Sequence, residues 1–107
     1  MQVAVLSLQE ALDLLHYCLE EQGDVRPSRH FRQELVNEAL EFVDVWHVMG
    51  KTGRMFNPPE HDVKTGEWKY TIEGHEPGGR WLVIVFTFKS VDQAFLITVW
   101  TVEAKGD

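Results

Sequence analysis

The sequence predicts an α+β domain in which two to three helices pack on a four-stranded antiparallel meander sheet. Three observations support this fold class. In the first half of the chain apolar residues recur at three- and four-residue steps, which is the helical period. From Arg54 onward they alternate with polar residues or form apolar runs, as strands do. Short segments rich in Gly, Pro, Asp and Ser separate these runs, as turns do between antiparallel strands.

Length and composition indicate one soluble domain that spans residues 1–107. The chain is 44% apolar and 25% charged, which is ordinary for a globular protein. Its single cysteine, Cys18, cannot form a disulfide within the chain. No apolar run approaches the roughly 20 residues that a membrane helix needs. We therefore expect a cytoplasmic protein that does not associate with membranes.

The net charge of −7 is unevenly distributed and divides the chain into two parts. Residues 1–24 form an acidic helical segment with five acids and no Lys or Arg, whereas residues 25–107 carry twelve acids and ten bases. An acidic surface repels phosphate backbones, so DNA is not an expected partner. Arg26, Arg29 and Arg32 form a local basic cluster beside His30, which is either a binding patch or a solvated helix face.

A first helix is predicted to begin after Ser7. Ser7 and Glu10 have the spacing of a capping box, in which each side chain accepts a hydrogen bond from a free backbone N–H of the first turn. Gly23 supplies a stop. Before the helix, Val3 and Val5 belong either to a brief edge strand or to an ordered lead-in. The apolar stripe of the helix, predicted to face the core, consists of Leu8, Ala11, Leu12, Leu15, Cys18 and Leu19.

A second helix is predicted to begin at Ser28, because Pro27 disfavours helix at the residue before it and serine is a good N-cap. Its core positions are Phe31, Leu35, Ala39 and then Phe42 or Val43. The helix pauses near Phe42 if Asp44 caps a short separate turn. Gly50 and Gly53 then end the helical region.

Four strands are predicted, over residues 54–57, 67–74, 80–89 and 94–103. The last two are apolar at both even and odd positions, so both faces of the sheet need cover there. The helices can cover one face. A subunit partner, the N-terminal segment or a bound ligand must cover the other.

Residues with chemical potential are sparse. The five histidines lack metal-ligand spacing and no glycine-rich loop follows a strand, so we expect no metal and no other cofactor. The remaining possibility is acid–base chemistry on a phosphodiester. His30, at a helix start that disfavours the imidazolium, is the candidate base, although Glu34 lies one turn away as a surface partner. The other candidates are Arg32, Arg54, Tyr70 and Arg80, and packing beside Trp68 and Ile72 also explains Tyr70.

Several segments, read in order, resemble a bacterial family known as domain of unknown function 4258. The resemblance covers about three-quarters of the chain and rests on residues 28–55, 58–74, 80–88 and 95–100. The family's motifs correspond here to Ser28 and His30, Asp44 and Val45 before Gly53, Trp68 with Tyr70 and Gly74, and Ile97 to Val99.

This family is similar in layout to the RelE and BrnT toxins, in which helices pack on a curved antiparallel sheet whose exposed face binds and cuts messenger RNA. The resemblance therefore implies a RelE/BrnT-like fold and a ribonuclease or toxin-like role. This chain departs from such toxins by being acidic and by having few lysines on its strands, so we consider two functions. In the first, the protein acts by binding, as a homo-oligomer or with one protein partner, through the exposed sheet face. In the alternative, it is a metal-independent endoribonuclease of a toxin–antitoxin system, with His30 as base, Arg32, Arg54 and Arg80 on the phosphate, and Tyr70 as a supporting donor.

Overall fold

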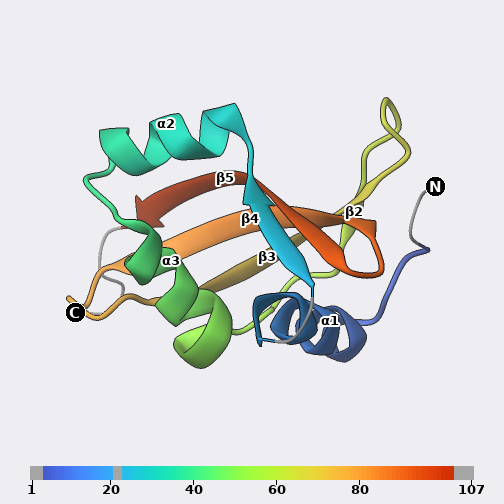
Figure 1. Ribbon diagram of the computed structural model, residues 1–107, viewed down its shortest axis with the longest axis horizontal. Coiled ribbons are helices and arrows are strands. Elements are labelled where there is room, and N and C mark those ends of the chain that lie inside the picture. The colour runs from blue at the N-terminus through green and yellow to red at the C-terminus, as the bar shows by residue number, and fades with distance from the viewer. Residues whose placement is uncertain (1–3, 21–22, 103–107) are drawn as a thin grey trace.

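The computed structural model describes residues 4–20 and 23–102, and the predicted α+β class is confirmed (Figure 1). Three α-helices lie within these residues, which agrees with the predicted number. In chain order, the elements are α1 (Leu8–Glu20), β1 (Asp24–Pro27), α2 (Arg29–Asn37), α3 (Phe42–His47), the π-helical turn η1 (Val48–Thr52), β2 (Glu60–His61), β3 (Trp68–His75), β4 (Trp81–Ser90) and β5 (Gln93–Val102).

The sheet differs from the predicted four-stranded antiparallel meander. It has five strands in the order β1-β5-β4-β3-β2, and β1 runs parallel to β5, so the sheet is mixed. Only β3, β4 and β5 form the expected long meander. The prediction is wrong because β1, with the sequence Asp-Val-Arg-Pro, shows no apolar alternation. Its pairing is supplied by distant residues: the Asp24 N–H donates to the Asp92 carbonyl at 2.8 Å, and the Ser28 N–H donates to the Leu96 carbonyl at 2.9 Å.

The first predicted strand, residues 54–57, is also misplaced. Arg54 alone forms an isolated antiparallel bridge with Glu73 of β3. The short strand β2 lies a few residues later, in a stretch whose prolines and polar residues predict a turn, and pairs Glu60 with Lys69. Proline has no backbone N–H to donate to a ladder, so pairing resumes only after Pro58 and Pro59.

The start of α1 is as predicted. The Ser7 N–H donates to Glu10 Oε1 at 2.8 Å and the Glu10 N–H donates to Ser7 Oγ at 3.1 Å, which confirms the capping box. Cys18 is buried, as expected of a core residue, and burial raises the pKa of its thiol. Val5 lies in an irregular lead-in, while Val3 falls outside the described residues.

The second helical region breaks earlier than predicted. The helix α2 ends at Asn37, and Ala39 adopts a φ of 55° that turns the chain out of the helix. Ala39 is therefore exposed, and Leu40 takes the buried position instead. Glu41 caps α3, and its N–H donates to Asp44 Oδ2 at 2.8 Å, so Asp44 completes a capping box rather than acting as the N-cap itself.

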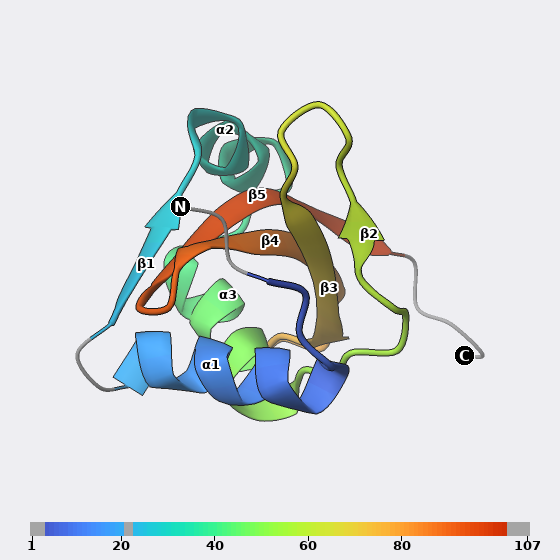
Figure 2. The ribbon, with the colours of Figure 1, turned by 90° about the vertical axis from the view of Figure 1, so that its right-hand side faces the viewer.

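The helices leave one face of the sheet without a helical layer. Figure 2 shows α1 and α3 on one side of the curved sheet and α2 along the edge of β5 beyond β1. Two side chains join α2 to that edge: Ser28 Oγ donates to the Ile97 carbonyl at 3.0 Å, and Glu38 Oε1 accepts from the Thr101 N–H at 3.1 Å. These bonds satisfy backbone groups that a bare edge would expose.

Candidate functional site

The sheet face turned away from α1 and α3 is the first candidate site. Alternate residues of the strands, such as Ile72, Ile84 and Val99, belong to the single hydrophobic core. The residues between them point to the other side, which we call the open face. It consists of Lys69, Thr71, Glu73 and His75 of β3, Trp81, Val83, Val85, Thr87 and Lys89 of β4, and Phe95, Thr98, Trp100 and Val102 of β5. No helix within the described residues packs on it.

Apolar side chains occupy the middle of the open face. Val83 pairs with Glu73 on one side and with Trp100 on the other, so the three lie in one row across the sheet. Val83 is only 7% exposed although it lies outside the core cluster, whereas Trp100 is 40% exposed. The face is therefore partly covered by its own side chains and still presents an indole ring to solvent.

A small polar network fixes one end of the open face. The Trp81 Nε1–H donates to Glu73 Oε1 at 2.9 Å. The ring of His75 meets the Trp81 ring edge-on, with 4.8 Å between their centres. The indole and the one carboxylate in this part of the face thus already have partners, and Glu73 is held in place as an acceptor rather than presented as a general base.

At the other end, the lysines of the open face are neutralised. Lys69 Nζ lies 3.1 Å from Asp62 Oδ2, and Lys89 forms an ion pair with Glu67. Lys89 Nζ also lies 4.9 Å from the centre of the Phe95 ring. Because each lysine has a carboxylate partner, the face has little positive charge left to attract a phosphate backbone.

Tyr70, a predicted proton donor, lies in the core. It is 2% exposed and its ring contacts those of Phe86 and Phe88. Its hydroxyl oxygen accepts a hydrogen bond from the Leu6 N–H at 3.0 Å. Burial raises the pKa of Tyr70, so the hydroxyl stays protonated. It anchors the segment before α1 and cannot reach a substrate on either surface.

Arg80, predicted on the phosphate, is committed to structural contacts. Its Nε–H donates to Glu76 Oε2 at 2.6 Å, and its Nη1–H groups donate to the carbonyls of Glu38 and Ala39 at 3.1 and 3.2 Å. Its Nη2 lies 3.8 Å from Asp44 Oδ2. Arg80 therefore joins the β3–β4 hairpin to the end of α2 and the start of α3.

The remaining predicted residues do not converge with Arg80. His30 and Arg32 lie on the exposed side of α2, and His30 Nε2 is 3.9 Å from Glu34 Oε2. Arg80 bonds the opposite end of this nine-residue helix, about 12 Å away at the helical rise. Arg54 pairs with β3, two strands from β5, which corresponds to about 10 Å. His30 and Arg32 share α2 but, being two residues apart, do not face each other, and both are separated from the other three.

Two features of the structure were not predicted from the sequence. The first is the Glu76–Arg80 pair, for which the available signal was opposite charges on either side of the Pro-Gly-Gly turn. The second is an apolar groove beside Trp46, described below. Helical periodicity identifies the inward side of α3, so it gives no signal for an outward-facing groove shared with other elements.

Two further features of the described residues concern metal ions and membranes. Among residues 4–20 and 23–102, no three His, Cys, Asp or Glu side chains gather closely enough to hold a metal ion. None of the helices in this part of the chain is long and apolar enough to cross a membrane.

Comparison with protein-family models, with curated proteins and with solved structures finds no match to this chain.

Proposed function

We propose that the protein acts by protein binding, and that the partner on the open face is a second copy of the same chain. The observation that supports this most is the exposed indole of Trp100, which lies beside the apolar Val83 on a sheet face that has no helical layer. Exposed aromatic residues on a preformed surface are typical of interaction sites. The proposal includes the RelE/BrnT-like layout and the membership of the family implied by the sequence resemblance.

The charge distribution favours a second copy over a basic partner. The acidic helix α1 packs on the opposite side of the sheet, where Ala11 and Leu15 join the core. On the open face, Lys69 and Lys89 are paired with acids. Two such faces can approach each other without the repulsion that a net charge of −7 would otherwise cause.

The same features weigh against the endoribonuclease alternative. A phosphodiester site needs a base, an acid and free cations around one point. Here Tyr70 is buried, Arg80 is bound to Glu76, and the lysines of the open face have carboxylate partners. The proposed function therefore assigns no catalytic role to His30.

Replacing Trp100 with Glu is expected to convert a dimer into a monomer. The substitution places a carboxylate beside Val83, in the same row of the open face as Glu73, where a second copy would have to bury it. Light scattering after size-exclusion chromatography gives the mass directly. Val43→Glu is the matched control, because Val43 is also exposed, at 60%, but lies on α3 on the other side of the molecule.

The expected result is twice the chain mass for the wild type and for Val43→Glu, and one chain mass for Trp100→Glu. A monomeric wild type, or a Trp100→Glu protein that still dimerises, contradicts the proposal. The same fractions are then incubated with mixed RNA. A monomer that cuts RNA and loses this activity on His30→Ala would replace the binding proposal with the ribonuclease alternative.

A further inference from the structure

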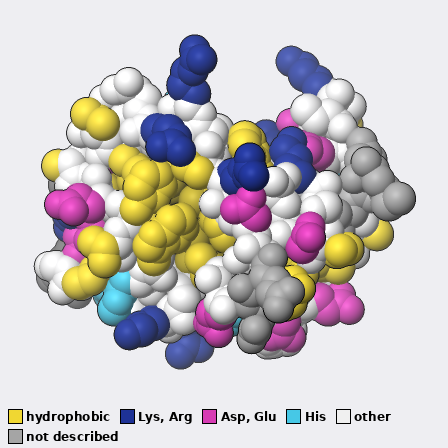
Figure 3. All heavy atoms as spheres, in the orientation of Figure 1, with side chains coloured by type: hydrophobic (Ala, Val, Ile, Leu, Met, Phe, Trp, Pro, Cys, Tyr) yellow, Lys and Arg dark blue, Asp and Glu magenta, His cyan; other side chains and the backbone are white. Residues whose placement is uncertain are grey.

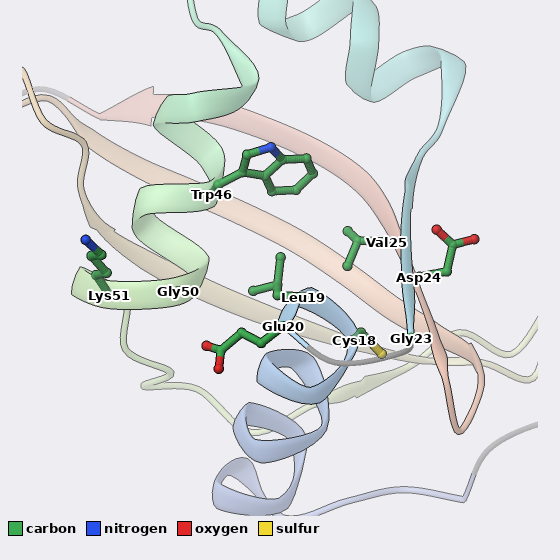
Figure 4. A pocket seen from close by; sticks show the side chains of 9 residues that line it. All are labelled: Cys18, Leu19, Glu20, Gly23, Asp24, Val25, Trp46, Gly50 and Lys51. Atoms are coloured by element: carbon green, nitrogen blue, oxygen red, sulfur yellow. The ribbon is translucent and has the colours of Figure 1, made fainter.

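The helical side of the molecule contains a second concave surface, distinct from the open face. Figure 3 shows hydrophobic side chains gathered on this side, with Lys or Arg side chains at the border of the patch. This surface includes a pocket of about 510 Å³ between the end of α1, β1 and α3. Its apolar lining includes Leu19, Val25 and Trp46, which point toward one another in Figure 4. We call this the Trp46 groove. Its volume is within the usual range for small-molecule sites.

The groove continues along α3 as a row of aromatic rings. The Trp46 ring stacks on Phe42, with 5.4 Å between ring centres and an angle of 21°. Phe42 in turn lies 6.5 Å from the buried ring of Phe31, which fixes its position. Trp46 is 36% exposed, so the indole is supported on the Phe42 side and remains accessible to a ligand.

One residue of the pocket lining, residue 50, is a glycine. Gly50 lines the pocket from η1, and a Cβ built there would meet nothing within 4 Å. Its φ is not in the left-handed region, so a side chain would be tolerated by the backbone. A larger residue at this position would fill space that is empty here.

Two basic side chains at the groove, Arg32 and Lys51, have no ion-pair partner among the described residues. The guanidinium carbon of Arg32 lies 5.8 Å from the centre of the Phe42 ring, and Arg32 makes no ion pair within the described residues. Among the acids, Asp24 is paired with Arg26, and the Glu41 side chain accepts a hydrogen bond from a backbone N–H at the start of α3. Glu20 lies on the same rim as Lys51 with no ion pair between them. At physiological salt, electrostatic fields are screened beyond about 8 Å. The nearby charge of Arg32, rather than the net charge of the chain, therefore determines which ligand charge this end of the groove favours.

From this arrangement we infer that the Trp46 groove binds a small amphipathic carboxylate. The apolar body lies between Trp46, Leu19 and Val25, and the acid group extends along Phe42 to Arg32. Guanidinium groups bind carboxylates through two parallel hydrogen bonds, and the stacked rings provide a continuous apolar path between the two contacts. The site is independent of the proposed dimer, because its residues lie on the helical side.

Isothermal calorimetry on the full chain with octanoate, 1-octanol and octyltrimethylammonium tests this inference. Octanoate is expected to bind most tightly, about tenfold more tightly than octanol, since a charge-assisted hydrogen bond contributes on that scale. The cationic probe is expected to bind least. Arg32→Gln should reduce octanoate affinity to the level of octanol and leave octanol affinity unchanged. Lys64→Gln, which removes the same charge from an exposed loop, should change neither affinity.

Gly50→Leu should abolish binding of both octanoate and octanol by filling the pocket. Should this variant fail to fold, Trp46→Ala provides a second test, and it should weaken both probes equally. Equal affinity for octanoate and octanol in the wild type would overturn the role of Arg32. Binding that survives Gly50→Leu and Trp46→Ala, or no binding of any probe, would overturn the site itself.

Discussion

Replacing Arg80 with Met is expected to lower the free energy of unfolding by about 3 kcal/mol, because it leaves a buried carboxylate without its counter-ion. Glu76 is 4% exposed, and its Oε2 accepts the Arg80 Nε–H at 2.6 Å, while its Oε1 has no hydrogen-bond partner. The guanidinium is itself 43% exposed, which keeps the expected loss at the lower end for a broken buried pair. Urea unfolding followed by circular dichroism at pH 7 measures the change.

The double variant Glu76→Gln with Arg80→Met separates the charge from the packing. An amide costs less to bury than an unpaired carboxylate, so the double variant should be more stable than Arg80→Met alone. The Arg80 bonds to the carbonyls of Glu38 and Ala39 are lost in both variants and do not affect this comparison. A double variant less stable than Arg80→Met would show that Glu76 is not an unpaired charge in the single variant.

The same pair predicts a pH dependence. Burial raises the pKa of Glu76, but the Arg80 hydrogen bond, the Gly78 N–H and the Arg80 charge together outweigh burial and lower it. A carboxyl whose pKa is lower in the folded state stabilises the fold above its unfolded pKa, and this contribution is lost as pH falls through the folded value. In Arg80→Met, burial acts on Glu76 without the opposing charge of Arg80, so protonation of Glu76 removes an unpaired buried charge and stabilises the variant. The stability difference between wild type and variant should therefore be smaller at pH 4 than at pH 7.

The sequence predicted those parts of the fold that depend on neighbouring residues. The capping box of Ser7 and Glu10, the hairpin turn before Arg80 and the alternation within β3 are all local signals, and all are present in the structure. The missed features depend on distant residues. The strand β1 exists because β5 supplies its hydrogen bonds. The helix α2 ends early, at Asn37, and the chain turns away at Ala39, a residue type that rarely adopts a left-handed conformation.

The same distinction between features set by neighbouring residues and features set by distant residues applies to the candidate surfaces. Apolar residues at both even and odd positions of β4 and β5 indicated that both faces were apolar, and this is how an open face was anticipated. This pattern does not say which set of side chains the helices cover. The grouping of His30, Arg54, Tyr70 and Arg80 failed because residue type alone carries no distance. Arg80 has the right charge for a phosphate, yet its donors are already bonded to Glu76 and to the carbonyls that end α2.

Alanine at Gly74 is expected to lower the free energy of unfolding by about 2 to 4 kcal/mol, since the chain of η1 crosses β3 at a contact between two glycines. A Cβ at Gly74 would lie 2.9 Å from the Cα of Gly53 and 3.0 Å from the carbonyl of Thr52. These are backbone atoms, and Thr52 is further held by a 2.7 Å hydrogen bond from its Oγ1 to the His75 carbonyl. Neither strand nor turn can therefore move aside cheaply.

Alanine at Gly53 should be at least as harmful, because its Cβ would lie 2.3 Å from the Val48 carbonyl oxygen and 2.7 Å from Ile72 Cγ1. Gly50→Ala is the matched control: its Cβ meets nothing, and the substitution should raise stability by about 0.5 to 1 kcal/mol. Thermal and urea unfolding of the three variants test the contact, and a Gly74→Ala protein as stable as the wild type would disprove it. Gly53 and Gly74 are also two of the residues that carry the family resemblance. If both glycines are required only for this crossing, that part of the resemblance reflects the packing of η1 on β3. The function of the open face then has to be established from Trp100 and its neighbours.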